Sequence, residues 1–446
     1  MSGADVPLLA VRDLEKHYPI TRGLLNTEIA RVRAVDGVSF ELRPGETLGI
    51  VGESGCGKST LAETVLRLEE PTGGEVLFKG DDVTELDGEA LTRFRREAQM
   101  IFQDPESSFD PRMSVGQAVA EPLRVQGLGD RDTREAVVRD LLERVGLQPG
   151  DVDRYPHEFS GGQKQRLGLA RALSVNPDLL VADEPVSALD VSIQSEILQL
   201  IDGFQEELGL AVLVISHDLA VVRDVCDRVA VMYLGEFVEV GPTEALFSDP
   251  RHPYTRALLG SIPTPDPSGN GVESTLAGTV PDPSDPPSGC RFHTRCPEVI
   301  PPESIDLPQD TWRKVLSFRT DLESAEIDPV GIVEAGLVRD EGDYAHLDDP
   351  QPDDVDGDDM ERWIRQEYGL PETLADSRAD RTVTVAIEAY LESDHERAAE
   401  TMRETFTTVC ERESPELTAV HEQRAACHLN AEPWSDHRPI EESEHD

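Results

Sequence analysis

The segment Gly52-Glu-Ser-Gly-Cys-Gly57-Lys58-Ser59 decides the fold of this chain. It follows the apolar run TLGIV (47–51) and precedes the helix-prone run LAETVLRL (61–68). A strand, a glycine-rich turn and a helix in this order form a phosphate-binding loop, in which backbone N–H groups and the helix N-terminus face phosphate oxygens. A chance glycine-rich turn would rarely match eight residues in this context. The sequence therefore predicts an α/β nucleotide-binding domain.

The residue types within this loop indicate what each contributes. Lys58 supplies a cation to the β- and γ-phosphates, and Ser59 supplies a hydroxyl ligand for Mg²⁺. Cys56 is better interpreted as a small buried filler than as a nucleophile. We expect ATP to be bound by Gly52, Glu53, Ser54, Gly55, Cys56, Gly57, Lys58, Ser59 and Thr60.

A second apolar run, LLVAD (179–183), ends at Asp183 and is followed by Glu184. One carboxylate at such a strand end can hold the Mg²⁺ shell, and its neighbour can orient or deprotonate the attacking water. An acidic pair after a strand is commonplace by itself, and the phosphate loop upstream gives it weight. We expect Asp183 to be a Mg²⁺ ligand and Glu184 to be the catalytic base.

Between these two motifs, FSGGQ (159–163) and the helical run KQRLGLARAL (164–173) resemble the signature motif of ABC ATPases. A Ser-Gly-Gly turn at a helix N-terminus is an anion site, and an ordinary helix N-cap also explains part of the pattern. The resemblance implies that two such domains close head to tail around ATP and reopen after hydrolysis. The residues that would cap the nucleotide of the opposite subunit are Ser160, Gly161, Gly162 and Gln163.

Further positions match the ABC family in the expected order. Gln103 in MIFQDP resembles the Q-loop, Ser187-Ala-Leu-Asp190 resembles the D-loop, and His217 in VISHD resembles the histidine that senses the γ-phosphate. The resemblance implies that His217 and Lys58 stabilise charge, and that Gln103 links the Mg²⁺ site, as a ligand, to a membrane partner. It also places Asp190 at the nucleotide.

Tyr18 matches the aromatic residue that stacks on adenine in the ABC family. The match is less specific because a long predicted loop, Thr21–Arg33, separates this tyrosine from the next recognisable block, VRAVDGVSF (32–40). A loop of this length suits the second of two paired ATPases. The resemblance therefore implies a heterodimer with a homologous second ATPase subunit.

Longer blocks are similar to the ATPases of the dipeptide, oligopeptide and nickel uptake group over nearly the first 300 residues; they are HYPITRG, VRAVDGVSF, MIFQDPESSFDPRMSV, PHEFSGGQKQR and HPYTRALLGSIPTPDP. This resemblance implies an ATP hydrolase coupled to peptide import (EC 7.4.2.-), at the cytoplasmic face of the cell membrane. Its partners would be two membrane permease subunits and an extracellular solute-binding protein. Import of nickel or another small solute is the alternative, and a soluble non-transport ABC ATPase is a third possibility.

The 446-residue chain carries a formal net charge of −48 from 89 acidic and 41 basic residues, of which only five are lysine. This acidity argues against nonspecific nucleic-acid binding. It suits a protein in concentrated salt, where screening shortens self-repulsion, so we expect a halophilic source. No basic leader followed by an apolar stretch and no apolar run of about 18 residues is present, so we expect membrane contact only through partners.

The order of patterns predicts an α/β domain, and the resemblance implies that it is a P-loop NTPase ABC nucleotide-binding domain at 6–250, with a helical subdomain at about 104–163. The clearest predicted strands are Thr47–Val51, Leu179–Ala182 and Ala211–Ile215, and Arg134–Val145 is a predicted helix. A C-terminal α+β extension with an acidic insertion would follow. Its predicted parts are a proline-rich connection with a first cysteine pair (251–302), the insertion (303–405), a second cysteine pair (406–430) and an acidic tail (431–446).

Within the acidic insertion we expect helices at Asp358–Tyr368 and Val383–Phe406. The four cysteines around it are Cys290, Cys296, Cys410 and Cys427. Similar blocks in the uptake group surround an iron–sulfur cluster, and four thiolates are the number that a [4Fe–4S] cluster needs. Tetrahedral zinc fits the same ligands, and no metal at all is the third alternative. Cys226, in the core, is expected to be buried and inert.

Overall fold

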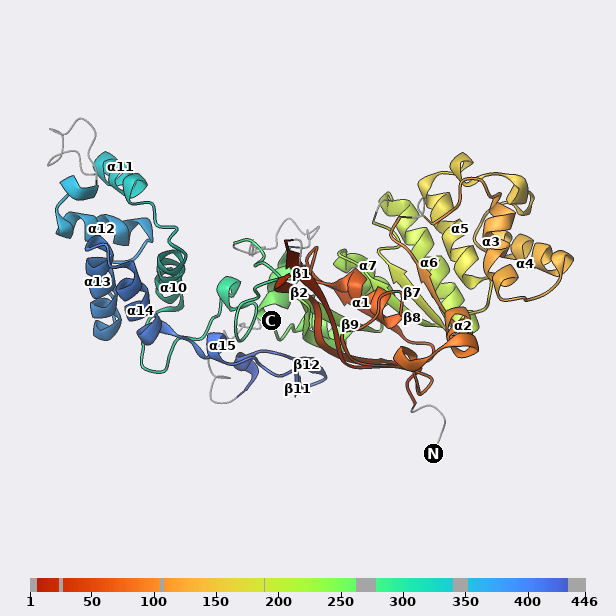
Figure 1. The fold of residues 1–446 in the computed structure, drawn as a ribbon, viewed down its shortest axis with the longest axis horizontal. Helices are drawn as coiled ribbons and strands as arrows, with labels where there is room; N and C mark the ends of the chain where they lie inside the picture. Colours follow the sequence, from red (N-terminus) through yellow and green to blue (C-terminus); the bar gives the residue numbers. More distant parts are fainter. Residues whose placement is uncertain are drawn as a thin grey trace, which may run out of the picture. The chain divides into compact units, whose positions relative to one another are not determined.

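The computed structural model describes residues 6–23, 27–104, 108–187, 189–261, 278–339 and 352–431. Parts of the predicted proline-rich connection, acidic insertion and acidic tail lie outside these ranges, as does Ala188 of the predicted D-loop. The chain divides into two compact units. We call Met1–Pro286 with Glu416–Cys427 the sheet unit, and Pro287–Pro415 with His428–Asp446 the helical unit (Figure 1).

Two sheets make up the centre of the sheet unit. The smaller is antiparallel, in the order β2-β1-β4-β5, and the larger runs β11-β12-β10-β9-β3-β8-β7-β6. The strands are β1 (Leu9–Arg22), β2 (Thr27–Leu42), β3 (Thr47–Val51), β4 (Gly73–Phe78), β5 (Asp81–Asp82), β6 (Ala98–Ile101), β7 (Leu179–Asp183), β8 (Ala211–Ile215), β9 (Arg228–Tyr233), β10 (Glu236–Pro242), β11 (Thr418–Val420) and β12 (Gln423–Ala425).

The middle of the larger sheet is parallel, since β3 pairs with β8 and β9, and β7 pairs with β6 and β8. Every residue of β3, β7 and β8 is buried. Their uninterrupted apolar runs are typical of parallel strands that are covered on both faces. The carboxyl ends of β3 and β7, where the two nucleotide motifs begin, therefore lie at the same edge of the sheet.

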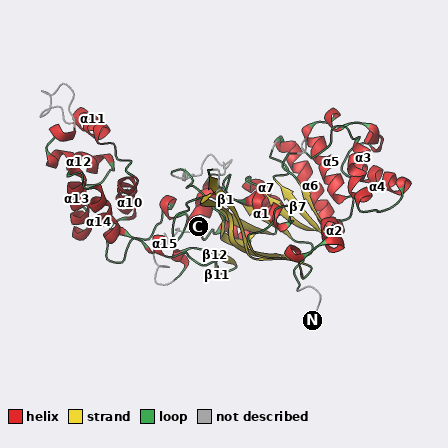
Figure 2. Cartoon of the chain, viewed as in Figure 1, coloured by secondary structure: helices red, strands yellow, loops and turns green. Residues whose placement is uncertain are grey.

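The helices of the sheet unit are α1 (Lys58–Val65), α2 (Gly88–Glu97), α3 (Val115–Val125), α4 (Arg131–Arg144), α5 (Gly161–Leu173), α6 (Val191–Leu208), α7 (Leu219–Val225), α8 (Thr243–Ser248) and α9 (Pro253–Gly260). The three helices α3, α4 and α5 pack on one another, and Figure 2 shows them gathered away from the strands. Ser114 caps α3 and Asp130 caps α4 by accepting backbone N–H groups.

The predicted core strands are confirmed, with Leu179–Ala182 extended by Asp183. The predicted loop Thr21–Arg33 is wrong, because β1 continues to Arg22 and β2 starts at Thr27. Exposed and half-buried residues alternate from Ile29 onwards, and this two-residue period favours a paired strand over a loop.

The helical unit contains the helices α10 (Gln309–Ser324), α11 (Pro329–Arg339), α12 (Gly357–Glu367), α13 (Ser377–Leu391), α14 (His395–Phe406) and α15 (Val409–Arg412). Its core includes the fully buried rings of Trp312, Trp363 and Phe406. Within its described residues there is no strand. The expected α+β extension is thus divided, because β11 and β12 join the larger sheet of the sheet unit.

The predicted helix Asp358–Tyr368 corresponds to α12, displaced by one residue. The predicted single helix Val383–Phe406 is wrong, because the chain breaks between α13 and α14. Ser393 has a left-handed backbone (φ 61°), and the Asp394 carboxylate caps α14 by accepting the Arg397 N–H. Across the described ranges, no helix has the length and apolar character needed to cross a bilayer.

Candidate functional site

The phosphate loop links β3 to α1 at the edge of the larger sheet. Its glycines allow a backbone path that other residues would block. Gly57 has φ 110°, and a Cβ added there would lie 1.9 Å from the Ala34 carbonyl oxygen. At Gly52 a Cβ would lie 2.2 Å from the Met232 carbonyl oxygen. The loop is therefore pressed against β2 and β9, and its shape depends on these glycines.

Lys58 begins α1 and is 5% exposed. Its ammonium group donates to the carbonyl oxygens of Gly52 (2.9 Å) and Glu53 (3.0 Å), so the cation is held over the loop. The Cys56 thiol is 3% exposed and burial raises its pKa. A neutral thiol is a poor nucleophile, which agrees with its interpretation as a filler.

Ser59 and Asp183 meet where α1 passes the end of β7. The Ser59 hydroxyl donates to Asp183 Oδ1 over 3.1 Å. Asp183 is 5% exposed, and its burial raises the carboxyl pKa against the lowering effect of the Ser59 hydrogen bond. A hydroxyl and a carboxylate are the oxygen ligands that Mg²⁺ takes beside substrate phosphates and water, so this pair fits the ion.

Glu184 follows β7 in a left-handed conformation (φ 44°), an unusual backbone state for a non-glycine residue. Its amide N–H donates to the Ile215 carbonyl oxygen (2.9 Å). Gln103 Nε2 donates to Glu184 Oε2 over 2.7 Å, and His217 Nδ1 lies 3.0 Å from Glu184 Oε1. Gln103, Glu184 and His217, which are expected to act together, are therefore joined by direct hydrogen bonds. The left-handed backbone of Glu184 agrees with this, because backbone strain is often found at functional positions.

A cavity of about 360 Å³ brings most of the predicted nucleotide residues together. Sequence reasoning missed several of its lining residues, because nothing in their local pattern indicates a ligand. The lining consists of Tyr18, Val32, Arg33, Ala34, Ser54, Gly55, Cys56, Gly57, Lys58, Ser59, Thr60, Gln103, Glu184, Leu234, Gly235 and Pro283. Tyr18 thus shares a cavity with the phosphate loop, at the point where it pairs with Val32 of β2.

The signature segment does not line this cavity. Ser160 is the N-cap of α5, with its hydroxyl accepting the Gln163 N–H (3.4 Å) and Gln163 Oε1 accepting the Ser160 N–H (3.0 Å). Both residues are exposed, whereas Gly162 is buried with its Cα facing the Ile193 side chain. Asp190 similarly caps α6 by accepting the Ile193 N–H. The structure therefore leaves the signature turn available at the surface of the sheet unit.

The tail cysteines lie in both units, with Cys427 in the sheet unit and the other three in the helical unit. The Cys290 N–H donates to the Cys410 carbonyl oxygen (2.7 Å), and Cys296 Sγ accepts the Glu298 N–H (3.4 Å). Burial raises the pKa of the Cys410 thiol. Among the residues that the structure describes, no three His, Cys, Asp or Glu side chains are grouped to hold a metal ion. The expected [4Fe–4S] or zinc site is therefore not supported.

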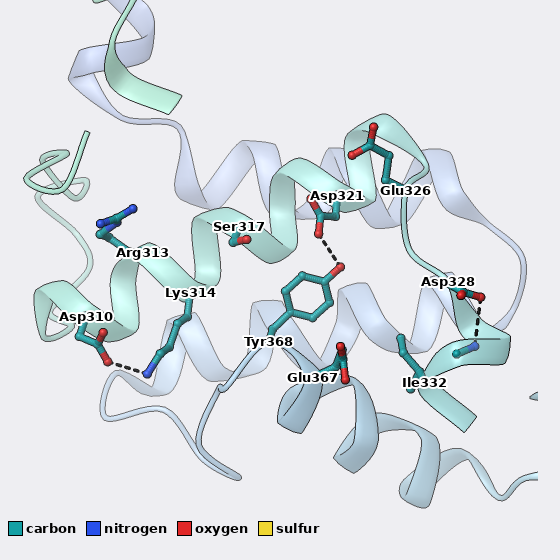
Figure 3. A pocket seen from close by; sticks show the side chains of 11 residues that line it. Asp310, Arg313, Lys314, Ser317, Asp321, Glu326, Asp328, Ile332, Glu367 and Tyr368 are labelled. Atoms are coloured by element: carbon teal, nitrogen blue, oxygen red, sulfur yellow. Dashed lines mark hydrogen bonds and ion pairs between the residues drawn. The ribbon is translucent and has the colours of Figure 1, made fainter. Parts of the chain in front are cut away.

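The helical unit has a larger cavity, of about 680 Å³, between α10, α11 and the end of α12 (Figure 3). Lys314 donates to Asp310 (2.6 Å) on one side, and the Tyr368 hydroxyl donates to Asp321 (2.8 Å) near the middle. The lining mixes both charges, and none of the residues predicted to bind nucleotide belongs to it. Its size alone therefore does not make it the active site.

Three family models match separate parts of the chain. Residues 35–187 match the ABC transporter family, and residues 238–301 match the C-terminal region of oligopeptide/dipeptide transporters. Residues 309–423 match a domain of unknown function, DUF8228. The phosphate loop, the signature segment and Glu184 all fall within the first match.

Curated relatives are similar over most of their own length. A putative peptide import ATP-binding protein of Brucella ovis is 50% identical over 305 residues, which cover 68% of this chain and 94% of that protein. The oligopeptide transport ATP-binding protein AppF of Bacillus subtilis is also 50% identical over 305 residues (68% and 93%). A probable peptide ABC transporter ATP-binding protein of Sinorhizobium fredii is 53% identical over 293 residues (66% and 83%).

Proposed function

The chain belongs to the family of ATP-binding proteins of ABC peptide importers, and on this premise we propose that it hydrolyses ATP to drive import of dipeptides or oligopeptides. One observation carries the proposal. Lys58, Ser59 and Glu184 line a single cavity at the carboxyl ends of β3 and β7, and Asp183 bonds to Ser59 at its edge. A cation, an oxygen pair suited to Mg²⁺ and a carboxylate base are the parts that phosphoryl transfer to water requires.

The phosphate loop binds and orients the substrate. Its backbone N–H groups and the N-terminus of α1 face the phosphates, and Lys58 exchanges its loop carbonyl partners for phosphate oxygens. Ser59 and Asp183 would hold Mg²⁺, which when bound neutralises phosphate charge. Tyr18, which lines the same cavity, would stack on the adenine ring.

Glu184 accepts a proton from the attacking water as the water oxygen bonds to the γ-phosphorus and the bond to the bridging oxygen breaks. Gln103 and His217 occupy both of its carboxylate oxygens. Each carboxylate oxygen can accept a further hydrogen bond, so an attacking water can bind Glu184 beside these partners. Movement of Gln103 toward the Mg²⁺ site would free Oε2, while His217 keeps the carboxylate oriented. Occupancy of the site and the position of the Q-loop are thereby linked.

A second ATPase subunit completes the site. The exposed Ser160–Gln163 turn is a helix N-terminus placed to accept phosphate from another copy, and no residue of it lines the cavity of its own chain. Asp190 would lie at the same junction. The resemblance favours a homologous partner and hence a heterodimer, docked on two permease subunits at the cytoplasmic face, with an extracellular binding protein delivering peptide. The exposed signature turn also fits a homodimer. Sedimentation of the purified chain with ATP distinguishes the two, because a homodimer would form without a second subunit and a heterodimer would not.

The acidic composition supports a halophilic source as part of this proposal. The tail cysteines stand outside the mechanism, and a [4Fe–4S] cluster is a separate hypothesis that rests on the four cysteines of the sequence. Anaerobic purification in molar KCl with iron, sulfide and zinc analysis tests it. About four irons and four sulfides per chain would establish the cluster, whereas an iron-free protein would refute it.

Substitution of the base tests the function. Glu184→Gln keeps the side-chain volume and removes the proton acceptor, so we expect ATP turnover to fall by about 10²- to 10⁴-fold while ATP binding persists. Glu135→Gln makes the same chemical change on the exposed face of α4 and should retain full turnover. Undiminished hydrolysis by Glu184→Gln would overturn the assignment of the base, and a wild-type chain that neither binds nor hydrolyses ATP would overturn the function.

A further inference from the structure

Tyr254, in the first turn of α9, reaches the phosphate loop from a distant part of the sequence. Its hydroxyl oxygen accepts the backbone N–H of Glu53 over 2.9 Å. Glu53 is the second residue of the loop, and its carbonyl oxygen is one of the two that hold Lys58. The same peptide segment is therefore fixed on one side by Tyr254 and on the other by the loop lysine.

The ring of Tyr254 is rigidly placed. Tyr254 is fully buried, and its ring packs at 4.7 Å, centroid to centroid, against Tyr233 at the end of β9. β9 is the direct neighbour of β3, from which the loop starts. Burial raises the pKa of Tyr254, so the phenol stays neutral and its oxygen is available as an acceptor.

The N-terminus of α9 is anchored by a buried carboxylate. Glu239 of β10 is fully buried and accepts the backbone N–H groups of Arg251 (2.6 Å) and His252 (2.8 Å). His252 then accepts the Tyr254 N–H through Nδ1 (3.0 Å). Burial lowers the pKa of His252 to about 3, so the imidazole is neutral and can act as an acceptor at working pH. A continuous set of buried and half-buried hydrogen bonds thus leads from β10 to the loop.

We propose that Tyr254 is a positioning residue of the ATP site, which holds the Glu53 peptide so that the phosphate loop is shaped before nucleotide binds. This inference rests on the proposed function and deepens it. Tyr254 lies in the segment matched by the C-terminal region of oligopeptide/dipeptide transporters, outside the ABC transporter match. The C-terminal region therefore supplies part of the architecture of the nucleotide site.

Loss of the hydroxyl should weaken binding through the loop. Without the tyrosine hydroxyl as acceptor, the Glu53 N–H no longer fixes the first turn of the phosphate loop. Only a fraction of the molecules then has the loop in the conformation that binds ATP. Apparent affinity falls in proportion to the competent fraction. If about one loop in ten remains competent, the Kd for ATP rises about tenfold, which corresponds to about 1.4 kcal/mol. Once nucleotide has restored the loop, turnover at saturating ATP should change less than KM.

The experiment compares the full-length wild type, Tyr254→Phe and Tyr368→Phe. Tyr254→Phe keeps the buried ring and removes only the hydroxyl. Tyr368→Phe removes a tyrosine hydroxyl that bonds to Asp321 in the helical unit, and serves as the matched control. Binding is measured with mant-ATP fluorescence and hydrolysis by phosphate release, alongside the thermal midpoint. We expect Kd and KM to rise about tenfold for Tyr254→Phe alone, with kcat within about threefold of wild type.

The outcomes separate this proposal from its premise. A lower thermal midpoint with unchanged Kd and KM would show a structural role only and overturn the positioning role. If wild type fails to bind mant-ATP, the proposed function fails instead. Should Tyr254→Phe be insoluble, Glu239→Gln, which removes an acceptor at the start of α9, must raise Kd in the same direction, and an unchanged Kd there would refute the proposal.

Discussion

Replacing Arg319 with methionine should weaken the helical unit by about 3 kcal/mol. The Arg319 side chain is 7% exposed, in α10. Its guanidinium donates to the Phe406 carbonyl oxygen (3.0 Å), to Glu411 Oε2 (2.9 Å) and to Glu323 Oε1 (3.0 Å). It therefore ties α10 to the end of α14 and to α15. Methionine fills the space of the side-chain stem but supplies none of these donors.

The expected loss of unfolding free energy follows from the carboxylate that remains when Arg319 is removed. Removing one member of a buried ion pair typically costs about 3–5 kcal/mol, because the remaining charge stays desolvated. The Glu411 side chain is 19% exposed and keeps some contact with water, so we take the lower end of that range. With a urea m-value of about 2 kcal/mol/M, the midpoint should fall by about 1.5 M.

Tryptophan fluorescence reports on this unit selectively. Trp312 and Trp363 are fully buried in its core, and residues 1–286 contain no tryptophan. Arg403→Met is the matched control, because Arg403 bonds to the same Glu323 but is 56% exposed, and its loss should cost less than about 1 kcal/mol. Adding Glu411→Gln to Arg319→Met should restore part of the loss. Equal midpoints for Arg319→Met and Arg403→Met would refute the reasoning.

Gly57→Ala should abolish mant-ATP binding, because the new Cβ would lie 1.9 Å from the Ala34 carbonyl oxygen. Gly55 also has a left-handed backbone (φ 80°), but a Cβ there would meet nothing within 4 Å, so Gly55→Ala should bind mant-ATP more weakly than wild type yet measurably. Equal binding by the two variants would contradict the steric argument. Burial would raise the pKa of Glu411, but the hydrogen bond from Arg319 and its charge lower this pKa in the folded protein. The stability that Glu411 contributes is therefore present above about pH 4.3, the pKa of an unfolded glutamate, and is lost as pH falls through the lower folded pKa. The urea midpoint by tryptophan fluorescence should therefore fall on acidification below about pH 4, less steeply in Glu411→Gln, and parallel profiles would count against this linkage. The thermal midpoint should rise from 0.1 to about 1 M KCl, as the Debye length shrinks from about 10 to about 3 Å around a chain of charge −48, and a midpoint independent of salt would remove the support for halophilic adaptation.

The parts of the fold that the sequence predicts are those with a local physical code. The run TLGIV, the glycine-rich turn and Lys58 define strand, loop and helix within a few residues, and the structure has them in that order. The sequence pattern does not predict the break at Ser393, because a single left-handed residue followed by an N-cap aspartate interrupts a helical pattern without changing its composition. Around Arg22 and Thr27 charged residues conceal the two-residue period, so the sequence pattern predicts a loop there.

The parts of the site that the sequence does not predict depend on long-range geometry. The contact between Glu53 and Tyr254 joins residues 201 positions apart, and no local pattern marks either residue as its partner. The sequence motifs predict that Gln103, His217 and Glu184 belong to the same site, but they do not predict which atoms meet. The structure shows that Gln103 and His217 bond to different oxygens of the Glu184 carboxylate.

The position of β12 has a consequence for biosynthesis. This strand pairs with β10 through Glu239 and Ala425, yet residues 287–415 of the helical unit are translated between the two. A nascent chain therefore presents the open edge of β10, with its unpaired ladder groups, until Gln423–Ala425 leave the ribosome. The helices, whose contacts are mostly local, can fold during this interval. A ribosome that stalls after Pro415 would release an ATPase with an uncovered sheet edge, which is a template for aggregation.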